Sequence, residues 1–522
     1  MYKIEWDEEN NYPVLKNENA VVGNEYRPVF SAELKKLGFE QFITFEESET
    51  APVLFAFRYQ YYYRGRAVAQ LIDNGCIRKP SIEILDESFV GTHLTPIDLA
   101  DWFRKNKKLM DQLVQDTLLR IYRVYMEWKD KVDYIDVAFS GGKDSMVLLD
   151  LVKRVLPKDS YFVSWIDSGM ERRESVEAIQ REMERCRKDG IAFWANHSIM
   201  NSLEAWETIG PPSFDNRWCC SVLQSVPKTI QMKERLGKKD AKGLIFLGNR
   251  AAESSQRMKS MLVNEGVKHK NQVDANGIIN WNSLEVFLYL MMNGIELNRA
   301  YIEGYLRIGC LLCPRASTIS LGFAYGNDPE EIEPYYNVIR NMYRDGFESE
   351  EALNEYINLG EWRFRKDAQG TRYHIGYREY VRDGFLHIAL TRPKTDWQMW
   401  IKTIGIVKSA ETDEEAPQRM RYTLLHAGRE YAFAVVPDGD GLDIAVSAEY
   451  EEAFLHLFKT VFRKAVSCIG CRTCEVNCPN DHLRFVNGAL EIDDGCLHCS
   501  QCHSGKHGCV VFDSWFETNQ VI

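Results

Sequence analysis

The chain has 522 residues, of which 45% are hydrophobic and 27% are charged, a composition typical of globular proteins. At roughly 100–200 residues per domain, this length predicts three to five domains. The formal net charge of −12 argues against broad coating of DNA or RNA, although it leaves room for a local basic groove. No apolar run of about 18 residues predicts a transmembrane helix, and the acidic N-terminus lacks the layout of a secretory signal. We therefore expect a cytoplasmic protein without membrane contact.

The order of expected elements divides the chain into four parts. These are an N-terminal α+β region of unassigned role (1–115), a nucleotide domain (116–330), a mixed α/β connecting region (331–460) and a cysteine-rich module (461–522). In the first part, a helix is expected to begin after Thr95 and Pro96 and to continue as a long amphipathic run. This run is expected to pack against the nucleotide domain.

The second part alternates strands with helices. Short apolar runs suited to buried parallel strands occupy 134–139, 161–167, 191–196 and 243–249, and helices are expected at 146–156 and 175–190. This alternation predicts an α/β fold with a doubly wound parallel sheet. In the third part, 422–436 and 442–448 are expected to form antiparallel strands, with a helix at 448–466 leading into the cysteine-rich module.

One glycine-rich loop, Ser140-Gly141-Gly142-Lys143-Asp144-Ser145, lies between an expected strand and an expected helix. Glycines allow a tight turn and close approach to a ligand, and a helix N-terminus attracts phosphate. Lys143 adds a point charge, the serines add hydroxyl donors, and Asp144 can position a helix-start amide or a metal ion. The alternative interpretation is a turn that only caps the helix.

This loop resembles the PP-loop of the adenine-nucleotide α-hydrolase superfamily and not the GxxxxGK[ST] loop. Further motifs over about residues 115–320 resemble, in their order, the phosphoadenosine-phosphosulfate (PAPS) reductase family: Asp167-Ser168-Gly169-Met170-Glu171, Leu247–Arg257, Trp281–Val286 and Tyr301–Pro314. The resemblance implies a Rossmann-like nucleotide domain. The nucleotide-binding residues that it implies are Ser140, Gly141, Gly142, Lys143, Asp144, Ser145, Asp167, Gly169, Glu171, Gly248, Arg250 and Glu253.

Three arginines stand within or beside these motifs. Arg250, Arg257 and Arg307 are expected to contact phosphate or a sulfur oxyanion, because planar guanidinium groups match such oxygens. Together with Lys143 and Asp144 they form the expected catalytic set. For any single arginine, the alternative is a surface ion pair.

The 14 cysteines are mostly grouped, and in a chain without a secretory signal such grouping indicates metal ligands more than disulfides. Cys219-Cys220 and Cys310-x-x-Cys313 supply four thiolates, which suit a zinc ion or a [4Fe–4S] cluster; unliganded thiols are the third alternative. The arrangement resembles the cluster site of assimilatory adenylyl-sulfate reductases and of related DNA-phosphorothioation enzymes. On this resemblance we favour a [4Fe–4S] cluster.

The C-terminal module contains the bacterial ferredoxin run C-x₂-C-x₂-C-x₃-C-P at Cys468, Cys471, Cys474 and Cys478. A second run follows at Cys496, Cys499 and Cys502, with Cys509 at a longer final spacing and without the proline. In two-cluster ferredoxins the fourth cysteine of each run ligates the other cluster. The expected groups are therefore Cys468, Cys471, Cys474 and Cys509 for one cluster, and Cys478, Cys496, Cys499 and Cys502 for the other.

Two enzymatic reactions and one non-enzymatic role fit this combination. The first is cleavage of ATP between its α and β phosphates, which adenylates an acceptor that then receives sulfur. The second is reduction of adenylyl sulfate or PAPS to sulfite. The intact SGGKDS loop favours the first, because reductases of the family usually have a degenerate loop. They also carry a catalytic Glu-Cys-Gly segment, and the nearest counterpart here, around Cys496, lies within the ferredoxin run. The third role is a nucleotide-regulated electron-transfer or redox-sensing protein.

The expected cofactors are three [4Fe–4S] clusters and an adenine nucleotide with Mg²⁺. The expected partners are an external electron or sulfur donor and an acceptor that is either a nucleic acid or a small molecule. A homodimer is among the assemblies considered, because residues 1–115 have room for a dimerisation role.

Overall fold

The structure is a computed structural model that describes residues 1–20, 25–238, 240–254, 257–266, 271–364, 376–414, 416–503 and 509. Ser255 and Gln256 of the Leu247–Arg257 motif, and residues 504–508 and 510–522 of the expected C-terminal module, lie outside this description. The chain forms two compact units. The first contains residues 1–197, 235–334 and 357–360, and the second contains 198–234, 335–356 and 361–522. Within the described residues, no helix combines the length and apolar character that a bilayer span requires.

The centre of the first unit is a six-stranded sheet. Its order is β12 (Ala192–His197), β11 (Phe162–Asp167), β10 (Tyr134–Ala138), β13 (Gly243–Phe246), β15 (Gln272–Ala275) and β14 (Val263–Glu265). The first five strands are parallel and β14 is antiparallel to β15. All four strands expected in the nucleotide domain are confirmed, as is the α/β class with a parallel sheet.

The strand order reverses at β10. From β10 the chain proceeds to β11 and β12 on one side, and then returns to β13 and β15 on the other. In open α/β sheets, ligands bind outside the carboxyl ends of the strands where the order reverses. The loops after β10 and β13 therefore lie where a ligand site is expected.

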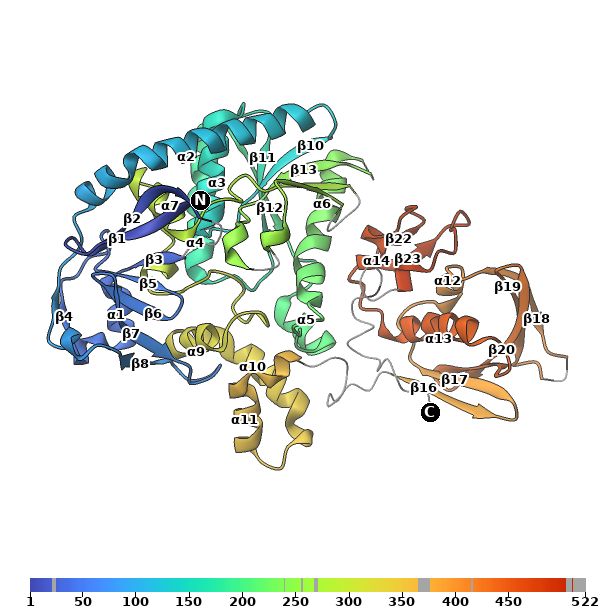
Figure 1. Ribbon diagram of the computed structural model, residues 1–522. Coiled ribbons are helices and arrows are strands. Elements are labelled where there is room, and N and C mark those ends of the chain that lie inside the picture. The colour runs from blue at the N-terminus through green and yellow to red at the C-terminus, as the bar shows by residue number, and fades with distance from the viewer. Residues whose placement is uncertain are drawn as a thin grey trace. The chain divides into compact units, whose positions relative to one another are not determined.

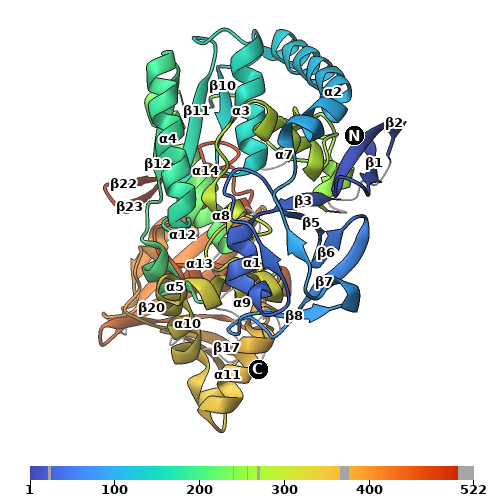
Figure 2. The ribbon, with the colours of Figure 1, turned by 90° about the vertical axis from the view of Figure 1, so that its left-hand side faces the viewer.

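Long helices pack around this sheet. They are α2 (Leu99–Trp128), α3 (Lys143–Val155), α4 (Arg173–Asp189) and α7 (Ser283–Met292). In Figure 1, α2 and α3 lie side by side, and both contact α7; Figure 2 shows α4 alongside β12. Helix α4 ends at Gly190 in the left-handed conformation (φ 74°), as the sequence predicts.

The helix expected to begin after Thr95 and Pro96 is confirmed. It begins at Leu99, and Asp98 caps it. The Asp98 carboxylate accepts hydrogen bonds from the backbone N–H groups of Ala100 and Asp101, which a helix would otherwise leave unsatisfied.

The N-terminal region belongs to the same compact unit as the nucleotide domain. It contains a five-stranded antiparallel sheet in the order β3 (Tyr26–Val29), β5 (Leu54–Phe57), β6 (Gln60–Tyr63), β7 (Arg66–Ile72) and β8 (Ser81–Ile84). The region also contains helix α1 (Ser31–Leu37). Two separate strand pairs are β1 (Tyr2–Asp7) with β2 (Tyr12–Asn19), and β4 (Thr44–Phe45) with β9 (His93–Leu94). Tyr12, Leu15 and Phe55 are part of the hydrophobic core that also contains the central sheet. The shorter helices α8 (Arg299–Ile302) and α9 (Thr318–Asn327) complete this unit's described helices before α10.

The second unit contains a six-stranded antiparallel sheet. Its order is β16 (Tyr377–Arg382), β17 (Phe385–Thr391), β21 (Gly441–Ser447), β20 (Arg429–Asp438), β19 (Met420–His426) and β18 (Ile406–Thr412). The strands expected at 422–436 and 442–448 are confirmed, with an additional turn at Ala427-Gly428 that divides the first into β19 and β20. Its other described elements are α5 (Ser202–Ile209), α12 (Trp397–Ile401), α13 (Glu452–Ser467), α14 (Thr473–Val476) and the hairpin β22 (Leu483–Val486)–β23 (Ala489–Ile492). Helices α6 (Val226–Leu236), α10 (Pro329–Tyr343) and α11 (Glu350–Leu359) continue from one unit into the other along the chain.

A buried ion pair within the N-terminal region lies against the nucleotide domain. Both Arg27 nitrogens donate to the fully buried Glu33 carboxylate at 2.6 Å, and Tyr61 donates to the same group at 2.7 Å. Gly304 lies directly against it: a Cβ there would come within 2.5 Å of the Glu33 side chain. The Tyr301–Pro314 motif therefore needs glycine at this position because the N-terminal region packs there.

We predict that Glu33→Gln destabilises the first unit by about 3 kcal/mol or more, because it leaves the buried Arg27 guanidinium without a counter-charge. Urea unfolding of the full chain, followed by tryptophan fluorescence, would show an earlier first transition. The matched control is Glu18→Gln, which removes an exposed partner of Lys3 and should leave that transition unchanged. Equal midpoints for Glu33→Gln and the wild type would contradict the prediction.

Candidate functional site

One position in the loop after β10 requires glycine. Gly141 has φ +70°, and a Cβ there would lie 3.0 Å from the Ser175 carbonyl oxygen and 3.1 Å from the Ile179 side chain. Gly142 is the N-cap of α3, so the helix begins directly at Lys143. The loop thus directs the free N–H groups of a 13-residue helix toward the carboxyl end of the sheet.

Hydrogen bonds hold this loop from both sides. The Ser145 hydroxyl donates to the Gly142 carbonyl at 2.8 Å, and the Asn298 amide donates to the Gly141 carbonyl at 2.9 Å. The Tyr301 hydroxyl accepts from the Lys143 backbone N–H at 3.3 Å. The loop is therefore fixed before any ligand arrives.

The loop after β13 meets the start of α3 closely. A Cβ on Gly248 would lie 2.9 Å from the Asp144 carbonyl carbon and 3.0 Å from the Ser145 nitrogen, so glycine is required for this approach. The contact brings Arg250 to the loop, where its Nε donates to Asp144 at 2.6 Å. On the other side of Asp144, the Lys143 ammonium lies 2.8 Å from the second carboxylate oxygen.

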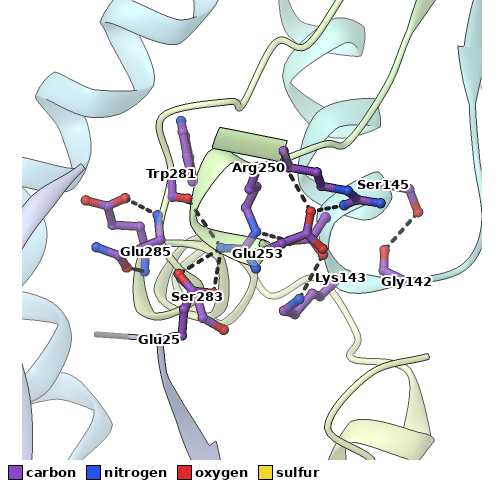
Figure 3. Close-up of polar contacts among 12 residues, drawn as sticks. Glu25, Gly142, Lys143, Ser145, Arg250, Glu253, Trp281, Ser283 and Glu285 are labelled. Carbon is purple, nitrogen blue, oxygen red and sulfur yellow. Dashed lines mark hydrogen bonds and ion pairs between the residues drawn. The ribbon is translucent and has the colours of Figure 1, made fainter. Parts of the chain in front are cut away.

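Glu25, from the N-terminal region, completes this network. Its carboxylate lies 2.8 Å from Arg250 Nη1 and accepts from the Ser283 backbone N–H, at the start of α7, at 3.1 Å. Figure 3 shows the Arg250 side chain reaching between Glu25 and the beginning of α3. Arg250 is only 2% exposed, so both of its ion pairs are shielded from water.

The buried charges of this network shift one another's pKa values. Burial lowers the pKa of Lys143, and the negative charge of Asp144 only partly offsets this effect. Burial also opposes ionisation of Asp144, but Lys143 and Arg250 outweigh it and hold the pKa of that carboxyl below its ordinary value. The site thus keeps Asp144 ionised between two cations.

The other two expected arginines belong to the same electrostatic neighbourhood. Arg257 pairs with Glu253, and burial followed by the nearby positive charge of Arg307 lowers the pKa of Arg257. Three arginines and Lys143 thus gather around the loop ends of β10 and β13. Like charges at short range repel, and a bound polyanion would relieve that repulsion.

The motif after β11 has a different local role. Asp167 accepts from the Gly169 N–H at 3.0 Å, and the Glu171 carboxylate accepts from the backbone and hydroxyl of Ser168 at 3.1 and 2.6 Å. Burial is the main cause of the raised pKa of Glu171. These two acidic side chains shape their own turn, and their expected contact with a nucleotide stays a prediction.

The sequence motifs missed two residues that shape the site. Glu25 lies in a segment without a recognisable motif, so nothing in the sequence indicated its contact with Arg250. Asn298 precedes the short helix α8, whose Ala300 N–H it caps, and this local role is its only sequence signal. Tyr301 begins the Tyr301–Pro314 motif, but the sequence did not predict it as a site residue.

The four cysteines of the first expected cluster are divided between the units. Cys310 and Cys313 are in the first unit, where the Leu311 N–H donates to the Met170 carbonyl at 2.7 Å beside the β11 loop. Cys219 and Cys220 are in the second unit, at the start of a π-helix, Cys220–Ser225, that continues into α6. The cluster on these four residues stays a prediction.

Several cysteines of the expected C-terminal module are neighbours, and the two clusters expected on them stay a prediction. The thiols of Cys468, Cys474 and Cys509 all lie within electrostatic reach of Lys464, and Cys471 lies near Cys468 and Cys474. Cys496 has Cys478 and Cys499 as its neighbours, and Cys502 is close to Cys496 and Cys499. Among the described residues, no three His, Cys, Asp or Glu side chains converge on a site for a single metal ion.

Part of the chain is similar in sequence to one known protein family. The phosphoadenosine phosphosulfate reductase domain matches residues 135–316, the span from β10 to just beyond Cys313. Two uncharacterised proteins of Methanocaldococcus jannaschii are 28% and 30% identical, each over 51% of this chain, and the matched regions span only 61% and 52% of those relatives. An adenosine 5′-phosphosulfate reductase of Halalkalibacterium halodurans is 26% identical over 40% of this chain and 89% of its own length.

Among solved structures, the phosphoadenylyl-sulfate reductase of Candida auris is 14% identical, with 38% of this chain and 93% of that chain covered and a TM-score of 0.29. The family match covers the segment that carries the loop, the arginines and the Cys310–Cys313 motif. The chain therefore contains, at residues 135–316, a domain of the phosphoadenosine phosphosulfate reductase type.

We predict that Asp144→Asn destabilises the first unit by about 3 kcal/mol, because it leaves Lys143 and Arg250 buried without their shared counter-charge. A polyanion should compensate, so ATP should raise the melting temperature of this variant more than that of the wild type. Thermal unfolding with ATP and with adenosine, which lacks phosphates, makes the comparison. Equal stabilisation of both proteins by ATP would show that the cations around Asp144 do not meet the phosphates.

Proposed function

We propose that the chain is an iron–sulfur enzyme of sulfur metabolism that binds an adenine nucleotide at the loop of α3. In its primary form, the proposal is cleavage of ATP between the α and β phosphates, with transfer of the adenylate to an acceptor and its replacement by sulfur. The observation that carries it is the complete phosphate loop, with Lys143 at the helix start and Arg250 held beside it through Asp144.

The chain's own residues suit the first half of this reaction. The N–H groups at the start of α3 and the ammonium of Lys143 would hold the triphosphate with its Mg²⁺, as helix N-termini and lysines do in other phosphate sites. An acceptor oxygen would attack the α-phosphorus, and the bond to the β-phosphate bridging oxygen would break to release pyrophosphate. The arginines around the loop would stabilise the negative charge that develops on the leaving group.

In the second half, a sulfur nucleophile would displace AMP from the adenylated acceptor. The acceptor and the sulfur donor stay open between a nucleic acid and a small molecule, and between sulfide and a persulfide. Where the sulfur must be reduced before it is released, two electrons are required. The C-terminal module would supply them from an external donor.

The C-terminal residues fit two [4Fe–4S] clusters. Cys468, Cys471 and Cys474 are neighbours, and so are Cys478, Cys496 and Cys499, which supports the crossed ligand pattern of two-cluster ferredoxins. Cys502 neighbours Cys496 and Cys499 and also Cys474. Backbone N–H groups of Gly470 and His498 donate to the sulfurs of Cys468 and Cys496, as expected around thiolate ligands. Bound there, the clusters would carry electrons one at a time.

One helix connects this module to the Cys219-Cys220 pair. Helix α6 follows the pair along the chain, and its Val226 and Ile230 pack against Val476 of α14, between Cys474 and Cys478. The helix is continuous from Cys220 to Ile230, π-helical over Cys220–Ser225 and α-helical after it. This packing supports the proposal that electrons from the module reach the Cys219-Cys220 pair.

A second candidate is reduction of adenylyl sulfate or PAPS. Two electrons and two protons would convert the sulfonucleotide to sulfite and AMP or adenosine 3′,5′-bisphosphate. The relatives described as adenosine 5′-phosphosulfate reductases favour it. Against it, Cys496 has neighbouring cysteines that suit a ligand group more than an isolated nucleophile.

Product analysis separates these candidates. Anaerobic, pre-reduced protein is given ATP, adenylyl sulfate or PAPS in separate tubes. Pyrophosphate and AMP from ATP without sulfite support adenylation, and sulfite from a sulfonucleotide supports reduction. Tight nucleotide binding without any product would instead indicate a regulatory or redox-sensing role and contradict both enzymatic proposals.

We predict that Lys143→Ala lowers nucleotide turnover by about 10²–10³-fold, because it removes a charge aimed at the phosphates. Iron content should not change, since Lys143 and the C-terminal cysteines are in different units. Steady-state rates and an iron assay on the same preparation test both statements. The matched control is Lys153→Ala on the same helix, which pairs with Glu182 at 2.5 Å outside the loop. Unchanged turnover in Lys143→Ala would remove the loop from the mechanism.

We also predict about twelve irons per anaerobically purified chain, four for each of three clusters. Iron and zinc assays measure this directly. Replacing both Cys219 and Cys220 with serine should remove about four irons and leave the spectrum of the C-terminal clusters intact. About eight irons with one zinc in the wild type would mean that the Cys219, Cys220, Cys310 and Cys313 set holds zinc.

A further inference from the structure

The second unit buries a lysine that has no carboxylate partner. Lys464 lies on α13 and is only 2% exposed. Its ammonium donates to the backbone carbonyl of Cys502 and lies 4.0 Å from the centroid of the Trp400 ring. No Asp or Glu within the described ranges is among its partners. Other lysines on the same helix differ: Lys459, for example, pairs with Glu379 at 3.2 Å.

A buried ammonium of this kind requires a negative neighbour. Transfer of an isolated charge from water to a protein interior is costly, and lysine is almost never fully buried without a partner. A carbonyl oxygen can accept a hydrogen bond from the ammonium, and an aromatic face attracts it through a cation–π interaction. Neither group carries a net negative charge. Within the described part of the chain, a counter-charge for Lys464 therefore has to come from a group other than a carboxylate.

The closest candidates are the cysteines of the C-terminal module. The Lys464 ammonium donates to the backbone carbonyl of Cys502, and the Lys464 carbonyl accepts a hydrogen bond from the Cys468 N–H at 3.0 Å, where α13 ends. Cys468 belongs to one expected ligand group and Cys502 belongs to the other. Lys464 thus lies beside a member of each group.

The neighbouring histidine makes a different contact. His503 is buried, and its Nε2 forms a hydrogen bond with the Thr403 hydroxyl. Within this described shell of Trp400, Thr403, His503 and Lys464, Lys464 is the residue with an aliphatic ammonium group.

We propose that Lys464 is a fixed positive charge that sets the reduction potentials of the two clusters in the C-terminal module. This inference rests on the clusters of the proposed function. Each electron that a cluster accepts makes it more negative, and a nearby ammonium shielded from water stabilises that reduced form. Net charge and hydrogen bonding near the sulfurs are among the factors that set cluster potentials. Lys464 therefore raises both potentials, so that the module accepts electrons more readily.

The test uses three variants of the full-length chain, purified anaerobically. Lys464→Gln removes the charge but keeps an N–H donor for the Cys502 carbonyl, Lys464→Arg keeps the charge, and Lys459→Gln is the control on the same helix. Iron content is measured first, and reduction potentials then come from redox titration followed by electron paramagnetic resonance. Lys464→Gln should lower the equilibrium constant for reduction about tenfold, which is about 59 mV for a one-electron couple. Lys464→Arg and Lys459→Gln should match the wild type.

Each other outcome decides the question. Wild-type potentials in an iron-replete Lys464→Gln variant would overturn the inference, and so would an equal shift in Lys464→Arg. If Lys464→Gln fails to retain iron while Lys464→Arg retains it, the charge is needed to hold the clusters, which supports the inference. Equal iron loss in both would reduce Lys464 to a packing role. Absence of iron from the wild-type module would refute the proposed clusters themselves, and that result is read before any variant is compared.

Discussion

Asp144 is the constraint on which the nucleotide site depends. It lies between the Lys143 ammonium and the Arg250 guanidinium, and neither cation is exposed enough for water to replace it. Its carboxylate lets the protein gather positive charge at the carboxyl ends of β10 and β13 without the full cost of burying like charges together. The glycine at 248 makes this possible, because any side chain there would push the two loops apart.

The N-terminal region is part of this site and not an independent attachment. Glu25 neutralises the second half of the Arg250 guanidinium and also accepts an N–H at the start of α7. The Arg27–Glu33 pair, in the same region, packs against Gly304, in the segment that holds Tyr301 and Arg307. The first 115 residues therefore supply one charged group of the site, the Glu25 carboxylate. They also pack against the segment that carries Arg307. A region without a motif of its own can thus be part of the chemistry.

Local patterns in the sequence predicted the parts of the fold that local forces determine. Short apolar runs predicted four of the five parallel strands in the nucleotide domain, together with the loop that follows β10. The fifth, β15, is a four-residue strand that was not predicted. Strand β18 could not be found in this way, because nearly all of its residues are exposed and no alternation marks it. The contact of Glu25 with Arg250 joins residues 225 positions apart, and no periodicity encodes it. The sequence placed the start of α2 after Thr95 and Pro96 but did not identify its cap, Asp98, whose carboxylate accepts from two backbone N–H groups.

The buried cations Lys143 and Arg250 of the first unit differ from Lys464 of the second unit in whether a carboxylate pairs with them. This difference fits the roles proposed for them. Lys143 and Arg250 each have carboxylate partners, so the site is stable without a ligand and a phosphate group must compete with Asp144 and Glu25 for them. Such pairs suit a ligand that binds and leaves in every turnover. Among the described residues, Lys464 contacts a carbonyl and an aromatic ring and no carboxylate. A cation without a carboxylate beside it suits an anion that stays in place, since each departure would leave the charge buried and unbalanced. This difference is consistent with an exchangeable anion proposed at Lys143 and Arg250 and a permanent one proposed at Lys464.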